Sequence, residues 1–210
     1  MRKGKSFIIS GPSGVGKSTV LKSLLGNRED IYFSVSATTR SPREGEVNGV
    51  HYHFIDADTF REWIAKDEFL EYAEYVGNYY GTPIQKIEEN LAAGNDVFLE
   101  IEVQGALKVR QKMPEGIFIF LAPPNLQELE SRITGRGTDG EAIIYERMQK
   151  AREEIELMQH YDYVVVNDEV EFAVEKINSI IQSEHLKVER VVDKIKADIH
   201  KYFQKGDESR

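Results

Sequence analysis

A glycine-rich octapeptide near the N-terminus constrains the fold more than any other feature of the sequence. Residues 11–18 read GPSGVGKS, an intact G-x-x-x-x-G-K-S pattern. A strand-like run, Phe7–Ser10, precedes it, and a helical pattern, Lys17–Leu25, follows it. Glycines let a backbone wrap closely around a phosphate chain, and the first N–H groups of a helix attract negative charge. The octapeptide in this setting predicts a loop that binds the phosphates of a nucleoside triphosphate.

Two side chains of this loop are candidates for chemistry. Lys17 is placed to reach the β- and γ-phosphates, and the Ser18 hydroxyl is placed to help hold Mg²⁺. Such a loop does not define a reaction, because GTPases, ATPases and small-molecule kinases share it.

Short β-rich runs alternate with helical patterns along the first 170 residues. Nearly continuous apolar character in several runs is typical of strands covered on both faces of a parallel sheet. The chain is therefore predicted to be an α/β protein with its binding site at the carboxyl ends of the strands. A helix is expected over Thr59–Tyr75, with Asp58 as its N-cap. The five expected strands are Phe7–Ser10, Tyr32–Ala37, Val97–Glu102, Ile117–Leu121 and Tyr163–Val166.

Two segments interrupt this alternation and are candidates for binding modules or lids. Residues 38–57 look like an irregular β insertion and carry Arg40 and Arg43, whereas residues 125–160 are charged and mostly helical. The second segment carries Arg132, Arg136 and Arg147. Two groups of arginines suggest two phosphate-bearing substrates held from opposite sides. For Arg147 taken alone, a surface ion pair with Glu146 or Glu153 on the same helix is the more common arrangement.

A pair of glutamates ends the third expected strand. Side chains alternate along a strand, so Glu100 and Glu102 are expected to share one face. Beside a phosphate loop they are candidates to order the water ligands of Mg²⁺ or to bind a substrate.

Composition narrows the function classes. The 210-residue chain has a net charge of −9, which argues against nucleic-acid binding and against an anionic membrane as partner. It has no cysteine, which excludes disulfides, thiolate metal sites and cysteine nucleophiles. The longest apolar stretch, Ile117–Ala122, is far too short to cross a bilayer. A soluble, cytoplasmic protein is expected.

The segment after residue 186 has apolar residues at steps of three and four. It is expected to form an amphipathic helix that packs on its own domain or pairs two copies of the chain. The spacing alone does not separate these alternatives. The apolar positions are Val188, Val192, Ile195, Ile199 and Phe203.

The order and spacing of several motifs give the chain a close resemblance to guanylate kinases over residues 4–186. The motifs are GPSGVGKST, FSVSATTRSPREGEVNGVHY, EFLEY, GNYYGT, LEIEVQGA, IFLAPP, SRITGRG and VVVND. The resemblance implies a P-loop three-layer sandwich with a five-stranded parallel sheet, a mixed α/β GMP-binding insertion at about 36–90 and a helical lid at about 125–160. Residues 187–210 remain as a helical extension.

The resemblance also implies Mg²⁺-dependent transfer of a phosphoryl group from ATP to GMP, and to dGMP, in purine nucleotide metabolism. It places Arg40, Arg43, Tyr52 and Tyr80 at the GMP phosphate. It places Ser36, Glu71 and Thr82 at the guanine, with Glu100 and Glu102 nearby. A carboxylate such as Glu71 suits guanine, because N1–H and the 2-amino group present two adjacent donors.

On the ATP side, the resemblance implies a lid that closes over the transferring group. The catalytic set is Lys17, Arg40, Arg43, Arg132, Arg136 and Arg147. The ATP-binding set is Gly11, Pro12, Ser13, Gly14, Val15, Gly16, Lys17, Ser18, Thr19, Arg132, Arg136 and Asn167, with Ser18 also at the metal.

Two other functions remain open at this stage. One is a protein-interaction module that has the same fold without catalysis, although an intact phosphate loop argues against it. The other is a related kinase with a different phosphorylated acceptor, against which Ser36 and Glu71 argue.

Overall fold

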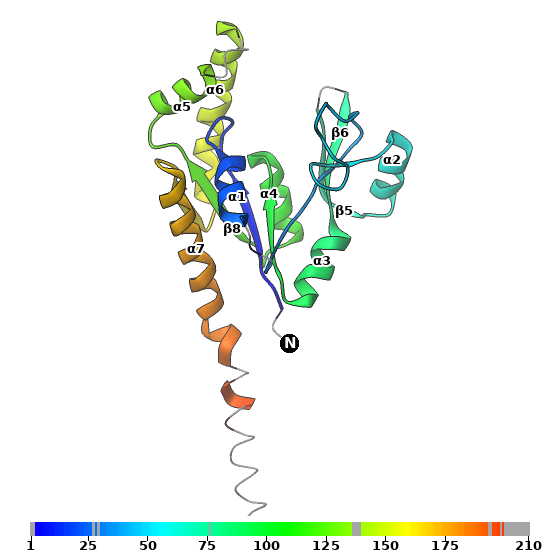
Figure 1. The fold of residues 1–210 in the computed structure, drawn as a ribbon, viewed down its shortest axis with the longest axis vertical. Coiled ribbons are helices and arrows are strands. Elements are labelled where there is room, and N and C mark those ends of the chain that lie inside the picture. The colour runs from blue at the N-terminus through cyan, green and yellow to red at the C-terminus, as the bar shows by residue number, and fades with distance from the viewer. Residues whose placement is uncertain are drawn as a thin grey trace, which may run out of the picture.

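The computed structural model describes residues 3–26, 28, 30–75, 77–135, 140–192, 195–197 and 199. In this part of the chain, two β-sheets and the helices around them form a central body with two arms (Figure 1).

The central sheet has five strands, all parallel, in the order β2-β7-β1-β8-β9. The strands are β1 (Ser6–Ser10), β2 (Ile31–Phe33), β7 (Asp96–Glu100), β8 (Ile117–Ala122) and β9 (Tyr163–Val166). The predicted α/β fold with a five-stranded parallel sheet is confirmed. Two expected strands were too long. The run Tyr32–Ala37 leaves this sheet after Phe33, and the strand expected to reach Glu102 ends at Glu100.

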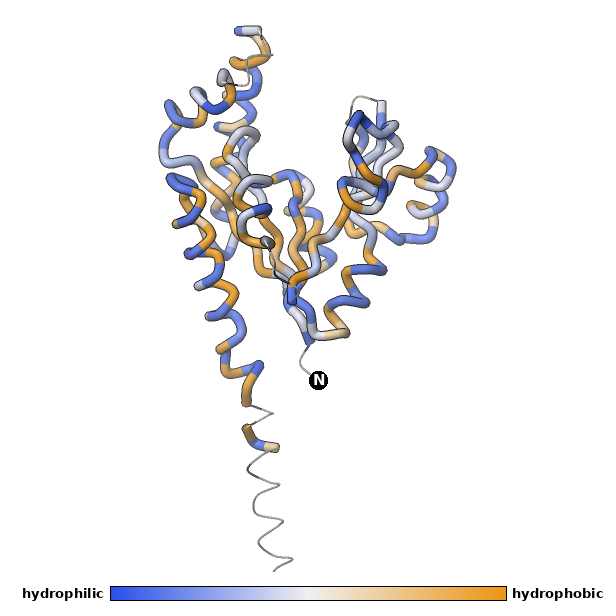
Figure 2. Tube along the Cα trace, viewed as in Figure 1, coloured by the Kyte–Doolittle hydropathy of each residue, from blue (hydrophilic) through white to orange (hydrophobic). Residues whose placement is uncertain are grey.

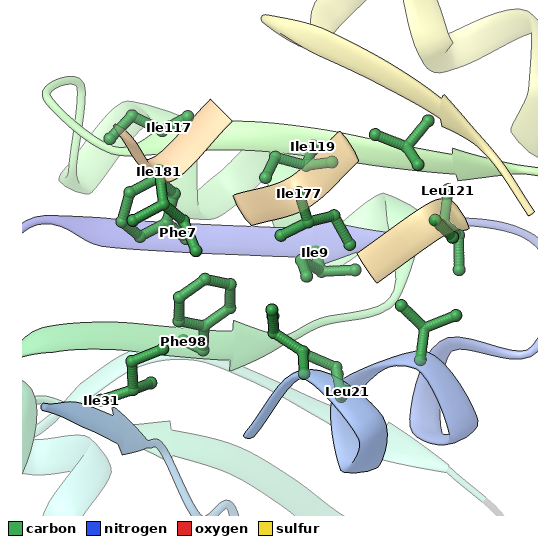
Figure 3. Packing of buried hydrophobic residues seen from close by; sticks show 14 of the residues in the cluster. Phe7, Ile9, Leu21, Ile31, Phe98, Ile117, Ile119, Leu121, Ile177 and Ile181 are labelled. Atoms are coloured by element: carbon green, nitrogen blue, oxygen red, sulfur yellow. The ribbon is translucent and has the colours of Figure 1, made fainter. Parts of the chain in front are cut away.

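Alternation along the strands builds one apolar core on each face of this sheet. Phe7 and Ile9 point to one face and are completely buried, whereas Ile8 points to the other. The first core contains α1 (Lys17–Leu25) and α7 (Val170–Leu186), and Figure 3 shows Ile177 and Ile181 of α7 above Phe7 and Ile9. The second core contains α3 (Ile84–Ala93) and α4 (Val103–Lys112). The layers therefore run helix, sheet, helix, and the apolar residues concentrate along the central strands (Figure 2).

The first arm is a four-stranded sheet in the order β4-β3-β6-β5, with α2 (Ala57–Ala65) packed on it. Its strands are β3 (Ala37–Thr38), β4 (His53–Phe54), β5 (Phe69–Tyr75) and β6 (Asn78–Pro83). The helix expected over Thr59–Tyr75 is wrong. Residues 57–65 are helical, but residues 69–75 form a strand, and the N-cap is Asp56 rather than Asp58.

Local chemistry explains why that helix stops. Asp67 adopts a left-handed backbone with φ of 53°, which an α-helix does not continue through. Beyond it, Phe69 stacks on Phe60 of α2 with ring centroids 4.3 Å apart. Aromatic residues are favoured in strands, and this packing fixes the second sheet against α2.

The second arm consists of α5 (Leu126–Thr134) and α6 (Glu141–Glu156), followed by a 3₁₀ turn, η1 (Leu157–His160). Leu129 and Ile133 of α5 pack on Ala151 of α6. The two arms flank the carboxyl ends of the central strands on opposite sides (Figure 1). The second arm lies within the 125–160 segment, whereas the first runs from Ala37 to Pro83, past the end of the 38–57 segment.

The chain continues from α7 away from the body (Figure 1). Residues 188–192 are helical, and Val188, Ile195 and Ile199 are at least half exposed. Phe203 lies outside the described residues. Nothing in the described part of this single chain supports pairing of two copies through residues 187–210, which stays a prediction. Among the described helices, none is long and apolar enough to cross a membrane.

Candidate active site

The glycine-rich loop between β1 and α1 has the conformation that close approach to a ligand requires. Gly14 and Gly16 have φ of 87° and 97°, in the left-handed region that favours glycine. A side chain at Gly16 would lie 2.7 Å from Nδ2 of Asn167, and one at Gly14 would lie 2.8 Å from the Ile133 side chain. The loop therefore needs glycine at these positions both for its backbone and for its packing.

Lys17 and Ser18 begin α1 at the base of this loop. The buried Lys17 donates from Nζ to the backbone oxygen of Gly11 over 2.7 Å. Ser18 donates from Oγ to the two carboxylate oxygens of Glu100, at 3.1 and 3.3 Å. Burial raises the pKa of Glu100, while the charge of Lys17 and the hydrogen bond from Ser18 oppose the rise. A lysine, a hydroxyl and a carboxylate thus meet at one point of the loop.

The α5–α6 arm contacts the loop directly. Arg132 of α5 donates from Nη1 to the backbone oxygen of Asn167 over 3.1 Å. The Asn167 side chain in turn donates to the backbone oxygen of Val15 over 2.8 Å. Arg147 of α6 donates to the Ser13 hydroxyl over 2.8 Å. These contacts fix consecutive parts of the loop to the base of the arm.

On the other arm, Arg40 lies among aromatic rings and one carboxylate. Its guanidinium makes a two-pronged ion pair with Glu46, at 2.9 and 2.8 Å. It also lies 5.6 Å from the ring centroid of Tyr52, whose ring is 6.0 Å from that of Tyr80. The hydrogen bond from Arg40, followed by one from the Arg43 backbone, lowers the pKa of Glu46 to about 2. Glu46 therefore stays ionised and holds the positive group in place.

Tyr52 lies partly buried beside this group. Burial raises the pKa of its hydroxyl, with further increases from Tyr80 and from Glu100 and a decrease from Arg40. The Tyr52 hydroxyl is therefore protonated at neutral pH and can donate a hydrogen bond.

Glu71 lies opposite Thr82 where β5 pairs with β6. The Thr82 hydroxyl donates to Oε1 of Glu71 over 2.7 Å. Burial raises the pKa of Glu71, and the hydrogen bond from Thr82 and the charge of Lys108 only partly oppose it. The second oxygen of a carboxylate held in this way can accept hydrogen bonds from a ligand.

Four other predicted site residues are exposed or contribute backbone contacts. Ser36 precedes β3, and its backbone oxygen accepts from His53. Thr19, Arg43 and Glu102 are exposed. The sequence had suggested that Glu102 shares a strand face with Glu100, but β7 has already ended, and Glu102 stands at the N-cap position of α4 without a side-chain capping hydrogen bond. Arg136 lies outside the described residues.

Two notable acidic residues of the arms were not predicted from the sequence. One is Glu46, which organises Arg40 and the Arg43 backbone. The other is Glu154 of α6, which is 2% exposed although it lies in a charged helical stretch. For Glu46 a signal exists, because a carboxylate three and six residues from two arginines suggests a turn held by ion pairs. For Glu154 the sequence offers none.

Within the described residues, no group of three or more histidine, cysteine, aspartate or glutamate side chains is arranged to hold a metal ion. The candidate ligands for a metal are therefore few. They are the Ser18 hydroxyl and the Glu100 carboxylate, both of which are oxygen donors of the kind that Mg²⁺ prefers.

A phosphate loop at the carboxyl end of a parallel sheet, with arginines on two flanking arms, defines the class of P-loop kinases. The sequence model of the guanylate kinase family matches residues 3–184. The chain belongs to the guanylate kinase family, and it is an enzyme.

Individual relatives agree over nearly the whole chain. It is 58% identical to the guanylate kinase of Halalkalibacterium halodurans over 192 residues, which cover 91% of this chain and 94% of that protein. It is 56% identical to the guanylate kinase of Bacillus subtilis, over 92% of this chain and 96% of that one. Among solved structures, the guanylate kinase of Anaplasma phagocytophilum is 35% identical, with a TM-score of 0.72 and 90% of each chain covered.

Proposed function

We propose that this enzyme transfers the γ-phosphoryl group of ATP to GMP, and also to dGMP, giving ADP and GDP or dGDP. The observation that carries the proposal is the phosphate loop, with Lys17 and Ser18 at its base, set between two arms that each carry arginines (Figure 1). Arg40 lies beside aromatic rings on one arm, and Arg132 and Arg147 contact the loop from the other. A phosphate group bound at Arg40 and one bound in the loop would be the two groups between which transfer takes place.

The ATP phosphates would lie in the loop formed by Gly11, Pro12, Ser13, Gly14, Val15, Gly16, Lys17, Ser18 and Thr19. Lys17 would exchange its hydrogen bond with the Gly11 backbone for one with the phosphates. Arg132 and Asn167 sit at the base of the other arm, on the side where the nucleoside would extend. Arg136 belongs to this proposed set through the family resemblance alone.

Mg²⁺ fits the residues at the base of the loop. Ser18 and Glu100 offer oxygen ligands, and burial of Glu100 without a full cationic partner favours a site that receives positive charge. When bound with ATP, the ion would neutralise charge on the β- and γ-phosphates. Ser18 would hold it directly, and Glu100 would orient the surrounding ligands.

Guanine would be recognised by Glu71. One carboxylate can accept hydrogen bonds from N1–H and from the 2-amino group, and Thr82 already holds it in place. Ser36 would donate to O6. Adenine lacks the N1 donor and carries an amino group in place of O6, so it would leave buried polar groups unpaired.

Transfer would need no covalent intermediate. An oxygen of the GMP phosphate attacks the γ-phosphorus, a new P–O bond forms, and the bond to the β-phosphate oxygen of ATP breaks as ADP leaves. Arg40 and Arg43, with the Tyr52 and Tyr80 hydroxyls, would hold the GMP phosphate. Lys17, Arg132, Arg136 and Arg147 would stabilise the charge on the transferred group once the α5–α6 arm closes. Closure would also exclude water, which would otherwise hydrolyse ATP.

The test is ADP formation from Mg-ATP with GMP, dGMP, AMP, UMP, CMP and dTMP supplied separately. Fast turnover with GMP and dGMP and background turnover with the other four is the expected result. Turnover with AMP equal to that with GMP would contradict the role of Glu71 and Ser36. Background turnover with all six would contradict the proposed reaction. Cytoplasmic location remains a prediction from composition.

A further inference from the structure

Helix α4 of the central body is in direct contact with strand β5 of the first arm. Lys112, the last residue of α4, donates from Nζ to Oδ1 of Asp67 over 2.8 Å and to the backbone oxygen of Phe69 over 3.0 Å. Leu70 of β5 belongs to the same apolar core as Ala106 of α4. The arm that carries the proposed guanine site is therefore attached to the central body through this helix.

The Glu71 carboxylate approaches α4 at a glycine. A Cβ atom on Gly105 would lie 3.3 Å from Oε2 of Glu71 and 3.7 Å from its Cδ. The Thr82 hydroxyl donates to the other oxygen, Oε1. The oxygen beside Gly105 is thus the one that Thr82 leaves for further hydrogen bonds.

The helix itself gives no reason for a glycine at this position. Gly105 is the third residue of α4, within helical backbone that alanine also adopts. Glycine is a poorer helix former than alanine, because it loses more conformational freedom on folding. The reason for glycine must therefore lie in the atoms around it.

Two neighbours limit the space at Gly105, and they predict different consequences of a side chain there. A Cβ atom would lie 2.9 Å from Cγ2 of Ile101, which is 4% exposed. This contact concerns the apolar core, so crowding it lowers stability. The contact with Glu71 concerns the acceptor site, so crowding it changes the binding of the base.

We propose that Gly105 is a positioning residue for base specificity, whose missing side chain leaves Oε2 of Glu71 in place and open to the purine of the acceptor nucleotide. Gly105 acts through Glu71 and does not itself bind the base. The inference rests on the proposed function in taking guanine as the base that Glu71 binds.

The chemistry of guanine explains why this space matters. Its N1–H and 2-amino donors lie side by side and use both oxygens of one carboxylate. A methyl group 3.3 Å from Oε2 would have to displace the carboxyl by a few tenths of an ångström. Hydrogen bonds to the purine would then lose their alignment. The atoms beside Gly105 belong to Glu71 and Ile101 and not to the phosphate loop, so ATP binding should not change.

The experiment compares Gly105→Ala with a matched glycine variant. Gly116→Ala is the control, because a Cβ atom there would lie 2.7 Å from Cδ1 of Ile8, in the same apolar core as Ile101. We expect the KM for GMP to rise about tenfold in Gly105→Ala, while the KM for ATP stays within about twofold. We expect the folded Gly116→Ala enzyme to keep both values. An unchanged KM for GMP in Gly105→Ala, or an equal rise in Gly116→Ala, would overturn the inference.

A double-mutant cycle with Glu71→Gln identifies the route of the effect. Because the methyl group acts through the Glu71 carboxylate, Gly105→Ala should cost no more than about twofold in kcat/KM for GMP when Glu71 is already glutamine. Equal fold losses in the two backgrounds would show that Gly105 acts through packing alone, and would overturn the inference.

A second variant covers the case in which Gly105→Ala does not fold. Ile101→Ala removes the Cγ2 atom that lies 2.9 Å away, so the double variant Gly105→Ala/Ile101→Ala keeps the methyl group beside Glu71 without that contact. Its reference is Ile101→Ala alone. The same tenfold rise in the KM for GMP is expected between these two proteins, and equal values would contradict the role of Gly105.

Binding of GMP without ATP, measured by titration calorimetry, separates this inference from the proposed reaction. We expect the Kd for GMP to rise about tenfold in Gly105→Ala and to stay unchanged in Gly116→Ala. If this pattern is found but wild type shows no turnover, the proposed reaction fails and the role of Gly105 stands. If wild type phosphorylates GMP and the Kd does not change in Gly105→Ala, the reaction stands and the role of Gly105 fails.

Discussion

The two ends of the central sheet bury carboxylates in opposite ways. At the amino end, Glu184 is 2% exposed in its side chain and is bound by Lys5 at 2.9 Å, Lys187 at 2.8 Å and the Tyr163 hydroxyl at 2.7 Å. Burial alone would raise the pKa of Glu184, but these hydrogen bonds lower it to about 2. Asp96, at the same end, lies 2.6 Å from Nε2 of His185. Charges at this end are balanced within the protein.

At the carboxyl end, the buried carboxylates are less completely paired with cations and hydrogen-bond donors among the described residues. Burial raises the pKa of Glu100, and of Glu71 and Glu154 on the two arms beside this end. Ser10 and Glu154 also retain buried atoms without partners among the described residues. The amino end is therefore built for stability, whereas the carboxyl end carries unfavourable polar burial that substrates would relieve. Variants at the two ends should therefore separate activity from stability.

The largest expected effect comes from Lys17→Ala, which removes the loop's cation. We expect kcat with ATP and GMP to fall about 10²- to 10³-fold, because the charge on the transferred group loses a stabilising partner. The fold should survive, since the hydrogen-bond partners of Lys17 among the described residues are backbone oxygens of the loop. Steady-state kinetics and circular dichroism measure the two properties. Lys22→Ala, on the exposed face of α1, is the control, and kcat near wild type in Lys17→Ala would contradict the assignment.

Glu184→Ala should produce the opposite pattern. We expect the free energy of unfolding at pH 7 to fall by about 3 kcal/mol, because Lys5 is left buried without its partner. Turnover of the folded enzyme should not change. Urea denaturation of the variant, of wild type and of the exposed control Glu175→Ala measures the loss.

The pH dependence of this loss has a definite sign. The folded pKa of Glu184 lies below its ordinary value of 4.5, so the stabilisation is complete above pH 4.5 and disappears as pH falls towards 2. The difference between wild type and Glu184→Ala should shrink over that range. A difference that stays constant down to pH 2 would show that the ionised carboxylate is not its source.

Glu71→Gln should lower the activity with GMP and raise the stability of the fold. We expect kcat/KM for GMP to fall about 100-fold, because the amide offers a donor to the guanine donors, while the KM for ATP stays within about twofold. The free energy of unfolding should rise at neutral pH, since a buried carboxylate is removed and Thr82 keeps an acceptor. Kinetics and urea denaturation test both effects, with Glu74→Gln, exposed on the same strand, as the control.

The pH dependence distinguishes this site from Glu184. Because the folded pKa of Glu71 is raised, wild type is destabilised by the charge above that pKa and recovers as pH falls through it. The stability advantage of Glu71→Gln should therefore shrink on acidification. An advantage that grows would contradict the direction of the pKa shift.

The sequence predicted the central sheet better than the arm that contains residues 59–75. Continuous apolar runs predicted the parallel sheet. A strand that is covered by helices on both faces is apolar at nearly every position, whereas a strand with one face in solvent alternates apolar and polar residues. The helix predicted over 59–75 was wrong in its second half. Phe60 and Ile64 follow a helical spacing, but the left-handed backbone at Asp67 ends this segment before the strand that begins at Phe69. Local spacing does not show such a break.

The candidate site was predictable only where a short motif carries the chemistry. The phosphate loop is contiguous, and its flanking strand and helix are visible in the sequence. Glu71 could be named through the family resemblance alone, because its contact with Thr82 depends on the pairing of β5 with β6. Glu154 looks like part of a solvent-exposed charged helix, and only tertiary packing shows that it is buried.

Glu46→Gln should give the smallest effect. It tests whether a fully paired carboxylate near the carboxyl end of the sheet contributes to substrate binding. In contrast to Glu71 and Glu100, the pKa of Glu46 is lowered, to about 2, because Arg40 and the Arg43 backbone both donate to it. We expect the KM for GMP to rise about threefold to tenfold with little change in kcat, because Arg40 loses its preset orientation but keeps its charge. Steady-state kinetics at saturating ATP measure the change, and Glu44→Gln, two residues earlier and exposed, is the control. A lower KM would mean that Glu46 competes with the GMP phosphate for Arg40 instead of orienting it.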